Sequence, residues 1–143
     1  MDQQPSEHVS TIRVEGERVS PKRLAVETAK TELVVGRDAS PVEYFLAAVA
    51  GCINSTGFVV ARDMDLDVDS LAVAVEGDVD YAAYKGVETD ERAGFEGVEV
   101  DVTVEADADE ATLDEWRRRV EERCPVTDNV ANETPVSLSV AGD

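Results

Sequence analysis

The 143-residue chain carries 32 acidic and 13 basic residues, which gives a formal net charge of −19. Nucleic acids and anionic membranes need local positive charge in their partners, so the composition excludes both as partners. An apolar fraction of 43% is too high for a disordered polyanion and predicts a folded protein. The acidic residues are spread along the whole chain rather than gathered in one tail, and we interpret them as an acidic, salt-adapted surface.

The length predicts one domain spanning residues 1–143. Residues 1–7 have the composition of a frayed terminus. Three short strands are expected next, at residues 9–14, 24–28 and 32–35, separated by turn-prone pieces that contain Gly16, Pro21 and Lys30. No basic stretch precedes an apolar core near the N-terminus, so we expect no signal peptide and a cytoplasmic location.

A long helix is expected to begin at Ser40. This residue suits the N-cap, Pro41 suits the first helical position, and Glu43 completes a capping box. The following residues are apolar nearly all round up to Arg62 and Asp63. We interpret this segment as a buried core helix rather than a membrane span, because Gly, Asn, Ser and Thr residues dilute it. Its lack of a polar face suggests that a second subunit supplies part of its cover.

The second half of the chain predicts two long strands, a helix and a last strand. Residues 66–80 alternate apolar and polar side chains with a slip near Asp69 that indicates a bulge, and residues 95–106 alternate cleanly. Residues 109–123 have acids first and arginines last, as a helix dipole prefers. Residues 127–132 suggest a further short turn, and residues 136–140 alternate as a final strand. This order of elements predicts an α+β protein.

Cys52 and Cys124, the only cysteines, are the candidate catalytic residues. Cys52 lies about three turns inside the long helix, too far from its N-terminus for the helix dipole to lower its pKa much. A nucleophilic Cys52 would therefore need a fixed cation, and an arginine suits that role because it stays charged when enclosed. Arg13, Arg18 and other arginines before the helix are candidates for it. The alternative is that both cysteines are buried as small apolar residues.

Other site chemistry finds little support in the sequence. A lone His8 near the terminus excludes a catalytic triad and a histidine-rich metal site, and two separated cysteines do not make a zinc site. No glycine-rich phosphate-binding loop occurs. We expect no cofactor and no metal.

The segment SPVEYFLAAVAGC around Cys52 and the CPV beginning at Cys124 resemble the OsmC/Ohr family of thiol-dependent hydroperoxide reductases. The resemblance implies antiparallel sheets wrapped around a long buried central helix, in an intertwined homodimer. It also implies that Cys52 attacks organic hydroperoxides, that Cys124 resolves the intermediate, and that an external dithiol or lipoyl group supplies electrons. Arg18, with Arg13 as a rival, matches the family's arginine.

One position departs from this pattern. Characterised peroxidases of the family carry a glutamate directly after the motif's proline, where this chain has Val42 and places the acid one residue later, at Glu43. A shift of one residue turns a helical side chain by about 100°. We therefore place the chain nearer the YhfA-like branch, with Glu43 as a possible supporting residue.

Three functions follow from these observations. The leading one is a thiol peroxidase that acts on organic hydroperoxides. The second is a redox sensor or a non-peroxidase thiol enzyme that uses the same cysteines. The third is a module that binds a small hydrophobic ligand, with structural cysteines.

Overall fold

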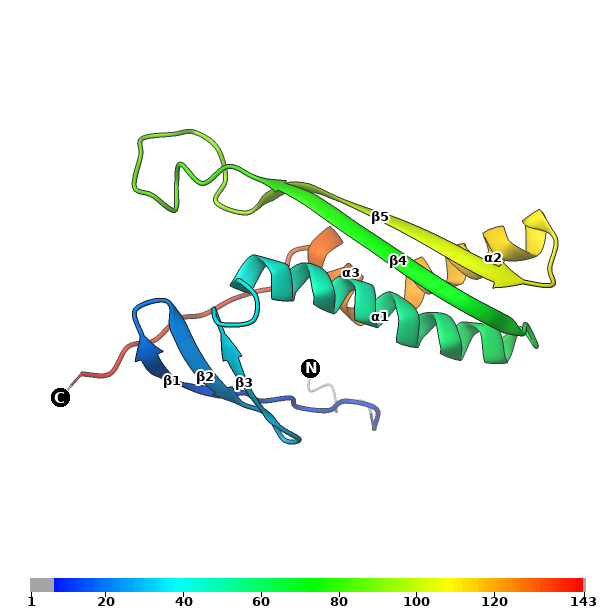
Figure 1. Ribbon diagram of the computed structural model, residues 1–143, viewed down its shortest axis with the longest axis horizontal. Coiled ribbons are helices and arrows are strands. Elements are labelled where there is room, and N and C mark those ends of the chain that lie inside the picture. The colour runs from blue at the N-terminus through cyan, green and yellow to red at the C-terminus, as the bar shows by residue number, and fades with distance from the viewer. Residues whose placement is uncertain (1–6, 143) are drawn as a thin grey trace, which may run out of the picture. The chain divides into compact units, whose positions relative to one another are not determined.

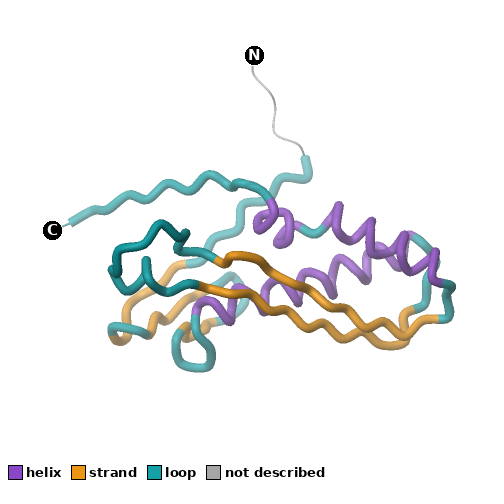
Figure 2. The backbone as a smooth tube through the Cα atoms, turned by 90° about the horizontal axis from the view of Figure 1, so that it is seen from above, coloured by secondary structure: helices purple, strands orange, loops and turns teal. Residues whose placement is uncertain are grey.

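The computed structural model describes residues 7–142, which fall into two compact units. The first unit extends to Tyr44 and the second begins at Phe45, and each is described by itself below (Figures 1 and 2). Residues 1–6, which make up most of the expected frayed terminus, lie outside the described part, and so does residue 143. The single-domain organisation stays a prediction.

The first unit contains a three-stranded antiparallel sheet in the order β1-β2-β3. Its strands are β1 (Glu15–Ser20), β2 (Arg23–Glu27) and β3 (Glu32–Val35). The prediction was right for the last two strands and wrong for the first, because residues 9–14 form no strand. Gly16 suggested a turn, but it lies within β1. A Cβ added there would come within 2.7 Å of a Leu24 methyl carbon, so the glycine allows close packing with β2.

Helix α1 (Pro41–Asp63) begins with the predicted capping box. The Ser40 N–H donates to Glu43 Oε1 at 3.0 Å, and the Glu43 N–H donates to Ser40 Oγ at 3.2 Å. The hydrogen bond from the Ser40 backbone, and then the Ser40 side chain, lower the pKa of the Glu43 carboxyl. The capping box confirms the predicted start of the helix, and its last residue, Asp63, confirms the predicted end.

A long antiparallel hairpin of β4 (Val68–Val79) and β5 (Phe95–Ala106) dominates the second unit (Figure 1). Alternate residues face inward, so that Val73 pairs with Val102 and Val75 with Val100. The pairing shifts between Val68 and Ser70, which confirms the predicted bulge.

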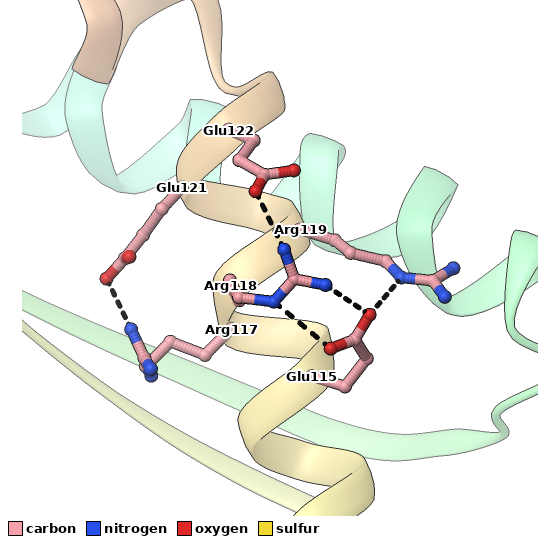
Figure 3. Close-up of polar contacts among 6 residues, drawn as sticks. All are labelled: Glu115, Arg117, Arg118, Arg119, Glu121 and Glu122. Carbon is pink, nitrogen blue, oxygen red and sulfur yellow. Dashed lines mark hydrogen bonds and ion pairs between the residues drawn. The ribbon is translucent and has the colours of Figure 1, made fainter.

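Helix α2 (Glu110–Arg123) follows the hairpin and is stabilised along its exposed side by ion pairs. Arg118 contacts Glu115 at 2.6 Å and Glu122 at 2.9 Å, and Arg119 shares Glu115 (Figure 3). The hydrogen bond from Arg118, followed by that from Arg119, lowers the pKa of Glu115. All these pairs lie at helical spacings of three or four residues, so they support α2 itself. A short helix, α3 (Pro125–Ala131), replaces the predicted turn.

The core of the second unit forms where α1, α2 and the inner face of the hairpin meet. Its buried members include Val49 and Val60 of α1 and Trp116 and Val120 of α2. The Trp116 Nε1–H donates to the Gly57 carbonyl oxygen at 3.0 Å, which fixes the indole against α1. Among the described residues, α1 alone is long and apolar enough to span a membrane, but its packing in this core favours a core helix.

The expected final strand is not formed. Residues 133–142 have no regular structure. Val136, Leu138 and Val140 are each about 90% exposed, so the alternating pattern has no neighbouring strand to pair with among residues 7–142. The described fold is otherwise the predicted α+β arrangement of antiparallel sheets and helices.

Candidate active site

The two cysteines lie in the second unit and face the same core. Cys52 is half-buried on α1, about three turns from the start of the helix. Cys124 is only 1% exposed and occupies the junction at which α2 ends and α3 begins. Both are free thiols. The structure therefore brings together two residues that are 72 positions apart in the sequence.

The two thiols lie close enough to affect each other's pKa. Burial has the largest effect on Cys52 and raises its pKa, and a hydrogen bond with the Cys124 side chain raises it further. The same contact has the opposite effect on Cys124. Burial alone would raise the pKa of Cys124, but hydrogen bonds from Thr127, Cys52 and Thr56 outweigh it and lower the pKa. Of the two thiols, Cys124 therefore ionises more readily.

Two threonine hydroxyls complete this cluster. Thr127 Oγ1 donates to Cys124 Sγ at 3.0 Å, and Thr56 Oγ1 lies 3.8 Å from Cys52 Sγ. The sequence analysis missed both threonines. Each follows its cysteine at a helical spacing, four residues on in α1 and three residues on in α3, so the spacing in the sequence could have identified them.

The second unit does not provide the arginine that was predicted to keep Cys52 ionised. Within residues 45–142, no arginine or lysine is among the groups that shift the pKa of either thiol. The candidates Arg13 and Arg18 belong to the first unit. Arg13 is held by Glu15 at 2.7 Å, whereas Arg18 forms no ion pair with a described residue. A contact between an arginine and Cys52 stays a prediction.

Glu43 also belongs to the first unit, and its carboxylate is occupied by the capping hydrogen bond from Ser40. Val42 beside it is half-buried. A supporting role of Glu43 in catalysis therefore stays a prediction, while its role as a helix cap is established.

A cavity of about 630 Å³ is lined by residues of α1, β5, α2 and α3, and neither cysteine is part of its lining. Ile53 of α1, Val102 of β5 and Trp116 of α2 contribute apolar walls, and Thr127, which contacts Cys124, also lines it. Charged residues of α2 such as Arg117 and Glu121 contribute to its lining. An apolar cavity with a few polar groups suits a small organic molecule. Among the described residues, no cluster of His, Cys, Asp or Glu could hold a metal ion.

Solved structures share this fold over most of the chain. An OsmC-like protein from Mycoplasma pneumoniae superposes with a TM-score of 0.77 at 14% identity, covering 87% of this chain and 89% of that one. A hypothetical protein from Aquifex aeolicus VF5 gives 0.72 at 17% identity, with 88% and 91% covered. An organic hydroperoxide resistance protein OsmC from Legionella pneumophila gives 0.64 at 16% identity, with 87% and 91% covered.

Sequence comparison points to the same family. No curated protein sequence matches the chain. The family described as OsmC-like protein matches residues 35–139, a range that contains both cysteines, all of α1 and the whole β4–β5 hairpin. The chain therefore belongs to the OsmC-like protein family.

Proposed function

We propose that this protein is a thiol-dependent peroxidase that reduces organic hydroperoxides through Cys52 and Cys124. The observation that carries the proposal is that two free thiols, the only two in the chain, come from separate helical segments to one core, where each affects the pKa of the other. The fold of a protein named for organic hydroperoxide resistance supports it, and so does the largely apolar cavity that Thr127, the hydrogen-bond partner of Cys124, lines.

The reaction needs only thiol chemistry. The Cys52 thiolate attacks the distal oxygen of the hydroperoxide, the O–O bond breaks, and the alkoxide takes a proton from solvent to leave as an alcohol. Cys52 is now a sulfenic acid. Cys124 attacks its sulfur, a disulfide forms, and water leaves. An external dithiol or lipoyl group then reduces the disulfide and is itself oxidised. No cofactor is required.

Cys52 is assigned the attack on peroxide because it is the more accessible of the two sulfurs. Since its pKa is raised in the reduced pair, it requires a guanidinium to become ionised at neutral pH. Arg18 is the better candidate for this role, because Arg13 is already bound to Glu15. The YhfA-like assignment, based on Val42, belongs to this proposal as well.

The test is steady-state turnover of cumene hydroperoxide with dithiothreitol or dihydrolipoamide as reductant. We expect turnover with both dithiols and a lower kcat/KM for hydrogen peroxide, which cannot fill the apolar cavity. Absence of turnover with every hydroperoxide would contradict the proposal. It would favour a ligand-binding module instead, for which the cavity is the specific support.

The active form we propose is a homodimer that packs along α1. Outside the core, α1 exposes an apolar face of small residues, Ala47, Gly51 and Ser55 among them, together with Phe58, which is 68% exposed. Large exposed apolar surfaces of this kind mark interaction sites. The location we propose is the cytoplasm, where free thiols persist.

Light scattering after size exclusion should give about twice the chain mass of 15.4 kDa. Phe58→Asp should shift the protein to a monomer, because a carboxylate would be buried in the apolar contact. Tyr84→Asp is the matched control, since Tyr84 is 73% exposed in the loop between β4 and β5 and its change should leave the dimer intact. A monomeric wild-type protein would contradict the assembly.

A further inference from the structure

The cysteine that ends α2 is held by the side chain of the residue three positions later. Cys124 occupies the N-cap of α3, and Pro125 and Thr127 lie in its first turn. This spacing returns the Thr127 side chain to the cap, where its hydroxyl donates to the sulfur at 3.0 Å. A hydroxyl that donates to sulfur favours the ionised form of the thiol.

Thr56 provides the second hydroxyl near the sulfurs. Its side chain is buried, and its hydroxyl lies 3.8 Å from Cys52 Sγ. It also contributes to lowering the pKa of Cys124. Each of the two sulfurs therefore has a threonine hydroxyl close to it. Within residues 45–142, the groups that lower the pKa of Cys124 against the effect of burial are the neutral donors Thr127, Cys52 and Thr56.

We propose that Thr127 is a positioning residue for disulfide formation, whose hydroxyl holds the Cys124 sulfur ready to attack oxidised Cys52. This inference rests on the proposed peroxidase function and adds a residue to it. In the step concerned, the Cys124 thiolate attacks the sulfenic sulfur of Cys52. The S–S bond forms, the S–O bond breaks, and the departing hydroxide takes a proton from solvent to become water.

The acid–base part is tested by following thiolate absorbance against pH in Cys52→Ser, where Cys124 is the only thiol. Adding Thr127→Val should raise the pKa of Cys124, and adding Thr127→Ser should preserve it. Thr134→Val is the matched control. It also removes a hydroxyl that donates to α3, at Asn129 Oδ1, but this hydroxyl does not touch sulfur. An unchanged pKa in the Thr127→Val protein would overturn the proposal.

The kinetic part uses the protein with both cysteines. Disulfide formation is driven once by stoichiometric cumene hydroperoxide and once by diamide, a two-electron thiol oxidant that needs no peroxidase activity. Thr127→Val should slow the step about tenfold at neutral pH, the usual effect of losing one hydrogen bond to a charged group. The deficit should vanish at a pH where Cys124 is ionised without Thr127. A purely structural defect would persist at every pH and would overturn the inference.

The two oxidants separate this inference from the function on which it rests. Slower disulfide formation with diamide, combined with no reaction of any variant with hydroperoxide, supports the role of Thr127 and contradicts the peroxidase. Equal rates for Thr127→Val and wild type with both oxidants contradict the role of Thr127 and leave the peroxidase standing.

Discussion

Cys52→Ser should reduce hydroperoxide turnover to the uncatalysed level, because a serine hydroxyl cannot be ionised at neutral pH and forms no sulfenic acid. The substitution replaces the sulfur atom by oxygen at a half-buried position and keeps the shape of the side chain. Turnover is measured with cumene hydroperoxide and dithiothreitol, alongside thermal unfolding to show that the fold is intact. A folded Cys52→Ser protein with wild-type turnover would contradict the assignment of the attacking sulfur.

Cys124→Ser is the informative comparison because it removes the second step and not the first. It should consume one equivalent of hydroperoxide and then hold Cys52 as a sulfenic acid, which dimedone traps and excess peroxide oxidises to sulfinic acid. If Cys124→Ser failed to react and Cys52→Ser gave the trapped sulfenic acid, the roles of the two cysteines would be exchanged.

Gly57→Ala should lower the free energy of unfolding by about 1–3 kcal/mol, the usual cost of overpacking a core. A Cβ at this position would lie 2.6 Å from Trp116 Cζ2, and Trp116 is also hydrogen-bonded to the Gly57 carbonyl. The sign of this change distinguishes a packed site from an exposed one. At an exposed helical site alanine would raise the free energy of unfolding, because it is the better helix former by about 1 kcal/mol. Urea unfolding measures the difference.

The control for Gly57→Ala is Gly97→Ala in β5. A Cβ there would meet nothing within 4 Å, so the same chemical change should leave stability unchanged or raise it slightly. If Gly57→Ala were as stable as Gly97→Ala, the close packing of Trp116 on α1 would not hold in solution.

Local signals in the sequence predicted much of the fold. The capping box of Ser40 and Glu43 located the start of α1, and strict alternation gave the bounds of β5. The slip near Asp69 corresponds to the observed shift in pairing. These features succeed because they depend on residues close together in the chain.

Features that depend on distant residues were harder to predict. Gly16 resembles a turn residue until its packing against Leu24 across the sheet is known. The alternation at residues 136–140 is a strand pattern, but the described chain provides no neighbouring strand. A strand needs a partner, and a single segment does not reveal one.

The candidate site shows the same division. The sequence identified Cys52 and Cys124 as chemically distinctive, but only folding could show that they meet. The lowered pKa of Cys124 depends on Thr127 and Thr56. These threonines lie near the sulfurs because the core packs α1 against the junction of α2 and α3.

The most direct test is peptide mapping by mass spectrometry after the reduced protein has met a single equivalent of organic hydroperoxide. The account predicts that the peptides containing Cys52 and Cys124 become joined within one chain by a disulfide, with loss of two hydrogen atoms. Recovery of both cysteines as free thiols, or their linkage only between different chains, would contradict it.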